Sequence, residues 1–272
     1  MLTSQALLVP HLPTLLVDEH RGHRTPMLEA LSEQAHRLQA ERPEAVVVLS
    51  ARWDSEGPFR VDVGRRHGTL TDYPGLGVEV RYDCAGHPRL ARALVQAGAK
   101  AGVHVGAAER GVDSGVTVPL HFLLSRPVSP VVPLSLARRP AGECRAWGAV
   151  IRRVLQARPE RVAFVVGGVL SHAIHAWNFK REVPEARAFD EHALRAISSG
   201  AWDDLQGADP ALAERAQPEA GLRHLEVLRG FLAADRPGLV RCYEEEHGIG
   251  AALVEFEIVD PVGAPHQRAG TR

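Results

Sequence analysis

Short, continuous apolar runs alternate with longer segments of helical periodicity over most of the chain. Residues 5–11 (QALLVPH) and 45–49 (AVVVL) have the dense apolar character of strands that are buried on both faces. Between them, residues 25–43 place apolar side chains at the spacing of one helix face, and an Arg-Pro pair ends that segment. A strand, a helix and a second strand in this order predict a β-α-β unit with parallel strands.

The same alternation continues toward the end of the chain. We expect further strands at 77–83, 103–106, 129–136, 161–168 and 248–258, a short helix after the loop that begins at 111, and longer helices at 87–102, 142–159, 184–200, 209–216 and 218–234. The acidic run at 243–250 (YEEEHGIG) is typical of a solvated turn. The pattern predicts an α/β fold with a mostly parallel central sheet flanked by helices. We expect one domain over residues 1–260 and a frayed polar tail over 261–272.

The composition narrows the classes of partner. Of the 272 residues, 45% are hydrophobic and 24% are charged, and the net charge of −1 provides no overall attraction to nucleic acid or to an anionic membrane. No apolar run is long enough to span a bilayer. The three cysteines are widely spaced and form no CxxC pair, which is typical of the reducing cytoplasm and indicates neither a disulfide framework nor a cysteine zinc site.

Polar residues follow three of the predicted strands. His11 comes after the first, Arg52 after the second, and the pair Ser171-His172 after the strand at 161–168. Open α/β sheets bind their ligands beyond the carboxyl ends of the strands, so these side chains are candidates for a shared site. Each also has a structural interpretation, because histidine, glycine and serine often cap or turn the chain after a strand, and Asp113 is suited to cap the turn that follows it.

The motifs, taken in order, resemble one known superfamily. They are VPHLPTLL, VVVLSARW, RGVDSGVTVPLHFL, SPVVPLSL, VVGGVLSHAI, AFDEHAL, PEAGLRHLEVLRGFL and GIGAALVEF, and they extend over residues 5–258. This order and spacing are similar to the class III extradiol ring-cleavage dioxygenases of the protocatechuate 4,5-dioxygenase β-subunit type, and to the related DOPA-dioxygenase and Memo-type proteins. The resemblance implies the same mostly parallel α/β fold.

The resemblance also implies a metal site. Enzymes of this superfamily hold one non-heme Fe(II), or zinc in some relatives, through two histidines and a carboxylate or a third histidine, which leaves positions open for substrate and O2. His11 corresponds to the first metal histidine. The carboxylate ligand corresponds to Glu219, with Glu226 as the second choice. His172 corresponds to the acid/base histidine, which is a metal ligand in some relatives.

Two positions depart from the superfamily pattern. Arg52 stands where a Ser-x-His turn supplies the second metal histidine, and Asp113-Ser114-Gly115 stands where the superfamily has Asp-His-Gly. Arginine stays protonated and has no lone pair to donate, so it is not a metal ligand. Three interpretations of Arg52 remain open: it binds an anion in a partly dry cleft, it pairs with Glu219 or Glu226, or it points to solvent beside a vestigial pocket.

These residues support two hypotheses on function. The first is Fe(II)-dependent ring cleavage of a catecholic or aminophenolic substrate, with Arg52, Ser114 and Asp113 in contact with the substrate. The second is a metal-free, non-catalytic relative that binds a small aromatic or anionic molecule, or that serves as the partner subunit of a catalytic paralogue. The related proteins are often dimers or larger assemblies, so we expect a homodimer or a hetero-oligomer.

Overall fold

A computed structural model of the protein describes residues 1–126 and 128–259. The strands are β1 (Leu2–Val9), β2 (Ala45–Ser55), β3 (Phe59–Asp62), β4 (Arg66–His67), β5 (Cys84–Ala85), β6 (Val105–Ala108), β7 (Val131–Ala137), β8 (Val162–Gly167), β9 (Leu239–Glu246) and β10 (Ile249–Glu257). The α-helices are α1 (Thr14–His20), α2 (Pro26–Ala40), α3 (Pro88–Lys100), α4 (Ser114–Leu123), α5 (Ala141–Gln156), α6 (Ile174–Asn178), α7 (Pro184–Ser199), α8 (Pro210–Ala216) and α9 (Arg223–Leu232), and the 3-10 helices are η1 (Trp202–Gly207) and η2 (Glu219–Leu222). The tail predicted at 261–272 lies outside the described residues.

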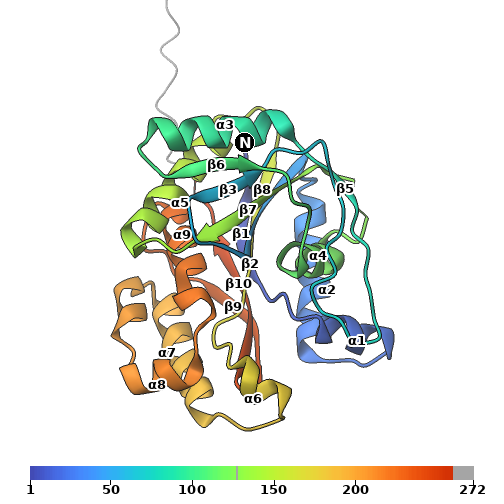
Figure 1. The fold of residues 1–272 in the computed structure, drawn as a ribbon, viewed down its shortest axis with the longest axis vertical. Helices are drawn as coiled ribbons and strands as arrows, with labels where there is room; N and C mark the ends of the chain where they lie inside the picture. The colour runs from blue at the N-terminus through green and yellow to red at the C-terminus, as the bar shows by residue number, and fades with distance from the viewer. Residues whose placement is uncertain (127, 260–272) are drawn as a thin grey trace, which may run out of the picture.

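A twisted sheet runs through the middle of the molecule (Figure 1). Its eight strands have the order β6-β3-β7-β2-β8-β1-β10-β9. The adjacent pairs within the central group, β7-β2, β2-β8 and β8-β1, are parallel, and so is the pair β3-β6. The contacts of β3 with β7, β1 with β10, and β10 with β9 are antiparallel. The prediction of a mostly parallel α/β sheet flanked by helices is therefore confirmed.

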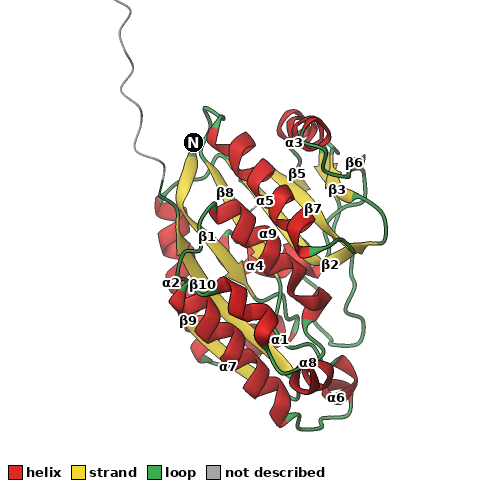
Figure 2. Ribbon diagram, turned by 90° about the vertical axis from the view of Figure 1, so that its left-hand side faces the viewer, coloured by secondary structure: helices red, strands yellow, loops and turns green. Residues whose placement is uncertain are grey.

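Helices cover both faces of the sheet: α5, α7, α8 and α9 lie on one side and α1, α2 and α4 on the other (Figure 1), and Figure 2 looks onto the face that α5, α7 and α9 cover. The side chains of β2 alternate between the two faces: Val47 and Leu49 join the core beneath α3, α5, α7 and α9, whereas Val46 and Val48 join the core beneath α2 and α4. A strand covered on both sides needs apolar residues at every position. This explains why residues 45–49 form a continuous apolar run.

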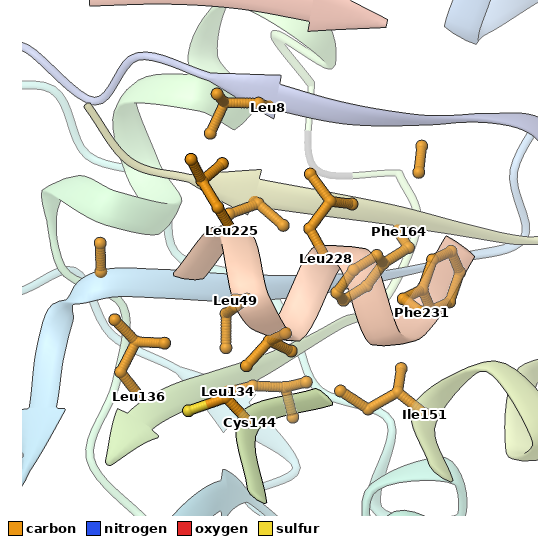
Figure 3. Packing of buried hydrophobic residues seen from close by; sticks show 14 of the residues in the cluster. Leu8, Leu49, Leu134, Leu136, Cys144, Ile151, Phe164, Leu225, Leu228 and Phe231 are labelled. Atoms are coloured by element: carbon orange, nitrogen blue, oxygen red, sulfur yellow. The ribbon is translucent and has the colours of Figure 1, made fainter. Parts of the chain in front are cut away.

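The larger core lies under α9 (Figure 3). This helix directs Leu225, Leu228 and Phe231 onto the central strands, and the rings of Phe231 and Phe164 lie with their centroids 4.1 Å apart. Removal of a buried side chain of this size from a close-packed core typically costs about 3–5 kcal/mol. The packing of α9 also fixes the position of η2, which directly precedes it and carries Glu219.

The strand predicted at 77–83 is wrong. This segment has no regular secondary structure and lies in the loop between β4 and β5. Its alternation has a different cause: Val78 and Val80 pack, together with Tyr73, into a small separate cluster around Val118. An alternating pattern reports which side chains are buried, and here no neighbouring strand pairs with the backbone.

The turn predicted at 243–250 is wrong in its first half. Its acidic residues belong to β9, which pairs only with β10 at the edge of the sheet, and the chain turns at His247 and Gly248. Residues along β9 are mostly half-buried on both faces. The strand therefore lacks the alternation that would have predicted it. In the described part of the chain, no helix has the length and apolar character needed to cross a membrane.

Candidate functional site

A cavity of about 300 Å³ opens where the central parallel strands end. His11, Arg52, Ser114 and His172 all line it. The rest of its wall is largely apolar and aromatic, with contributions from Leu12, Tyr73, Leu76, Ile174, Trp177 and Ile249. Four residues that the sequence predicts for the site, and that lie up to 161 positions apart along the chain, thus face one space.

The strand order brings the three strand-end residues together. Strand β8 lies between β1 and β2, and all three are parallel, so their carboxyl ends meet at one edge of the sheet. His11 lies two residues after β1, and the backbone of His172 forms a bridge with Ile249 at the start of β10. Arg52 lies within β2, where the register with β7 shifts between Ser50 and Asp54. That irregularity allows a side chain of β2 to reach the cavity.

His11, in the cavity wall, forms a buried pair with Glu219, which does not line the cavity. His11 Nε2 lies 2.7 Å from Glu219 Oε1, and the two side chains are only 3% and 5% exposed. Glu219 Oε2 accepts a hydrogen bond from the backbone N–H of Val169 at 2.7 Å, and the Glu219 N–H donates to the carbonyl of Leu170. These bonds attach η2 to the chain that leaves β8.

The two members of this pair shift each other's pKa values in opposite directions. Burial alone would lower the pKa of His11, but the charge and hydrogen bond of Glu219 outweigh it and raise that pKa above its usual value. Burial alone would raise the pKa of Glu219, but the charge and hydrogen bond of His11 lower it to about 2. Both shifts favour the charged forms, so the pair is an imidazolium–carboxylate ion pair at pH values between the lowered pKa of Glu219 and the raised pKa of His11.

Glu219, and not Glu226, is the carboxylate at His11. Glu226 lies on α9, where Oε2 accepts from Arg145 Nη1 at 2.7 Å and Oε1 accepts from the side-chain amide of Gln206 at 3.3 Å. Its contacts join α9 to α5 and η1, away from the cavity.

Arg52 is paired with a carboxylate that the sequence analysis did not consider. Asp72, in the loop between β4 and β5, accepts from Arg52 Nε at 3.4 Å, from the Ser114 hydroxyl at 2.8 Å and from the Ser114 N–H at 3.1 Å. Arg52 is thus held inside the cavity by an internal ion pair, although the partner is neither Glu219 nor Glu226. No pattern in the Pro- and Gly-containing loop around Asp72 pointed to this role.

Asp113 lies beside the cavity and does not line it. Its side chain is buried, Oδ1 accepts from the Ser50 hydroxyl at 2.6 Å, and Oδ2 pairs with Arg110 Nη1 at 2.5 Å. Both oxygens are therefore used inside the protein. We do not assign Asp113 a substrate contact.

His172 lines the same cavity, and its lowered pKa favours the neutral imidazole. Burial lowers its pKa, and the nearby charges of His11 and Arg52 act in the same direction against the opposing charge of Glu219. The turn that carries His172 is attached to α7, because Asp190 of that helix accepts hydrogen bonds from both the N–H and the hydroxyl of Ser171. A neutral imidazole in a cavity wall is suited to accept a proton from a ligand hydroxyl.

His224 is a further histidine that the sequence analysis missed. It is fully buried in the first turn of α9, and neither ring nitrogen has a hydrogen-bond partner in the described structure. Burial lowers its pKa to about 4, so it stays neutral. In PEAGLRHLE the resemblance points to the carboxylates, whereas the buried face of α9 includes His224 together with Leu225 and Leu228.

Comparisons with known proteins show the family of the chain and its fold. The family described as "Catalytic LigB subunit of aromatic ring-opening dioxygenase" matches residues 5–256. The chain belongs to the LigB family. It is similar to a 4,5-DOPA dioxygenase extradiol of Beta vulgaris, with 23% identity over 200 residues that cover 71% of this chain and 72% of that protein. An uncharacterized protein of Escherichia coli K12 has a similar fold, with a TM-score of 0.69 and 19% identity over 93% of this chain and 99% of that one. The class III extradiol superfamily and its fold are thereby confirmed.

LigB-family enzymes generally use non-heme Fe(II), but the residues of this cavity do not fit that ion. Within residues 1–126 and 128–259, no group of three His, Cys, Asp or Glu side chains is placed to hold a metal. The second histidine position holds Arg52, which has no lone pair to donate to a metal. A guanidinium in the same wall adds repulsion to the loss of a ligand.

Proposed function

We propose that this LigB-family protein binds a small aromatic molecule with a hydroxyl or carboxylate group in the cavity, and that it does so without a metal. The observation that carries the proposal is the position of Arg52, whose guanidinium faces the cavity where the family has a metal histidine. A permanent cation on the protein replaces part of the charge that a bound metal would supply.

The wall of the cavity supports a ligand of this chemistry. Tyr73 and Trp177 offer aromatic surface, and a volume of about 300 Å³ suits a single substituted ring. Within the described residues, both the hydrogen bond and the ion pair of Arg52 use Nε, which leaves its two terminal amino groups available for a carboxylate or phenolate. His172 supplies a neutral acceptor for a hydroxyl proton.

Fe(II)-dependent ring cleavage is the second candidate, and one specific observation favours it. His11 and Glu219 correspond to two of the family's metal ligands, and they lie within 2.7 Å of each other. His172, which corresponds to the acid/base histidine, lines the same cavity as His11. In this function His11 and Glu219 would hold an Fe(II) ion that supplies open positions for O2 and the catecholate, and His172 would accept a proton from the substrate hydroxyl.

The first experiment tests metal-free binding. Protein dialysed against EDTA is titrated with benzoate, 4-hydroxybenzoate and catechol by isothermal calorimetry. We expect binding of at least one of these probes, and a loss of tenfold or more in affinity for that probe in Arg52→Gln, which removes a charge-assisted hydrogen bond. The matched control is Arg153→Gln, at an exposed arginine of α5 outside the cavity, which should bind as wild type does. Absence of binding for all three probes refutes the proposal.

The second experiment separates the two candidates. Protein purified anaerobically with Fe(II) is analysed for bound metal and incubated with catechols in air while a yellow ring-fission product is monitored. We expect little iron and no product in wild type. Arg52→His restores an imidazole next to His11 and Glu219, so it should raise the iron content. Near-stoichiometric iron together with turnover by wild type would establish the second candidate instead.

A further inference from the structure

We infer that Asp72 is the specificity-determining residue of this cavity, and that it restricts anionic ligands to those with a single negative charge. The inference rests on the proposed function, because it concerns which aromatic acids the cavity accepts. Its basis is that a carboxylate of the protein shares the cavity wall with the guanidinium of Arg52.

Asp72 is held firmly in this position. Both of its oxygens accept hydrogen bonds from Ser114, one from the backbone N–H and one from the hydroxyl. The next residue, Tyr73, is buried against Leu16 and Val118, and its hydroxyl accepts from the N–H of Val80. The bonds from Ser114 and the burial of Tyr73 therefore hold the carboxylate of Asp72 in the cavity wall.

The charges around the cavity cancel in pairs. His11 is paired with Glu219 at 2.7 Å, and in the wall itself Arg52 is paired with Asp72 at 3.4 Å. His172 is neutral, so it adds no positive charge. A first negative charge on a ligand can use the terminal amino groups of Arg52, but a second charge finds no unpaired cation among these residues.

Coulomb repulsion between Asp72 and the ligand sets how strongly the cavity prefers a monoanion to a dianion. The side chains of Arg52 and Asp72 are 36% and 24% exposed, so the effective dielectric lies between that of water and that of a protein interior. Two like charges about 6 Å apart in such a medium repel each other enough to weaken binding roughly tenfold for each ligand charge. A dianion therefore experiences about one factor of ten more repulsion from Asp72 than a monoanion.

The test compares benzoate, a monoanion, with phthalate, a dianion near pH 7.5, by calorimetric titration of metal-free wild type and Asp72→Asn. Asparagine keeps the shape and retains an acceptor for the Ser114 N–H. We expect wild type to prefer benzoate, and we expect Asp72→Asn to shift the ratio of the two affinities roughly tenfold toward phthalate. The difference in size between the probes cancels because the same ratio is compared in two proteins.

The matched control is Asp83→Asn. Asp83 lies in the same loop and also accepts hydrogen bonds from a backbone N–H and a hydroxyl, both of Thr69, but it does not line the cavity. Its substitution should leave the ratio unchanged. Asp72→Ser removes the charge with a smaller side chain and should shift the ratio as Asp72→Asn does. Agreement between the two variants shows that the shift comes from the loss of the charge and not from the asparagine side chain.

The outcomes separate the two levels of inference. If both probes bind and Asp72→Asn does not change their ratio, Asp72 is not the charge filter, although the proposed function stands. If Asp83→Asn shifts the ratio equally, the effect comes through the loop and the filter is refuted. If neither probe binds to wild type or to Asp72→Asn, the charge filter is refuted, whereas the proposed function fails only if 4-hydroxybenzoate and catechol do not bind either.

Discussion

The buried pair of His11 and Glu219 leads to the most direct prediction, for the variant Glu219→Gln. The pKa of Glu219 falls from 4.5 to about 2 in the folded protein. At about 1.4 kcal/mol per pKa unit, this corresponds to about 3 kcal/mol of stability. Removal of one partner from a buried ion pair typically costs about 3–5 kcal/mol, so the two considerations agree. We expect Glu219→Gln to lower the free energy of unfolding by about 3 kcal/mol.

The pH dependence of that loss has a defined sign. The contribution of Glu219, whose pKa is lowered, is present above pH 4.5 and is lost as the pH falls toward 2. The contribution of His11, whose pKa is raised, is present below pH 6.5 and is lost as the pH rises through the raised value. The stability difference between wild type and Glu219→Gln should therefore be largest between pH 4.5 and 6.5.

Urea unfolding followed by circular dichroism from about pH 4.5 to about pH 9 measures this difference. The control is Glu33→Gln, because Glu33 is 73% exposed and its carboxylate lies 3.8 Å from Arg37 on the surface of α2. An exposed pair of this kind contributes less than about 0.5 kcal/mol. A cost for Glu219→Gln no larger than that of the control, without a maximum in the acidic range, would refute the ion-pair interpretation.

Further predictions concern buried groups near the site. Burial raises the pKa of Asp190 to about 6, so its contribution to stability is present below pH 3.8 and is lost as the pH rises through about 6. As the pH rises from about 4 to about 7, the free energy of unfolding of Asp190→Asn, measured in urea, should therefore increase relative to that of wild type by up to about 3 kcal/mol. Gly250→Ala should cost about 3 kcal/mol or more, because a Cβ would lie 1.7 Å from Asp190 Oδ2, whereas Gly142→Ala on α5, which meets no atom within 4 Å, should be neutral or slightly stabilising in the same measurement. By scanning calorimetry, His224→Leu should change the unfolding free energy by less than about 1 kcal/mol, since its ring makes no hydrogen bond in the described structure. His11→Leu should cost about 3 kcal/mol or more because it leaves a buried carboxylate without its cation.

The sequence by itself determined the class of fold and one edge of the site. Continuous apolar runs are required wherever helices cover both faces of a strand, so the central strands were visible in the residue pattern. Their parallel direction places their carboxyl ends together, and His11, Arg52 and His172 follow those ends along the chain. The position of each of these three residues just after a predicted strand was therefore enough to predict which edge of the sheet it lies at. The strand predicted at 77–83 failed because burial in a loop can imitate the alternation of a strand.

Only the tertiary structure decided which groups contact each other. The resemblance placed Glu219 or Glu226 in one site with His11, and the structure shows that Glu219, 208 positions away, is the contact, because α9 packs on the sheet and carries η2 with it. The partner of Arg52 is Asp72, in a loop whose local pattern contains no sign of the ion pair. Such contacts depend on strand order and on helix packing over the whole chain. A window of residues records local burial and turns, but it contains no information on which distant carboxylate will neutralise a given cation.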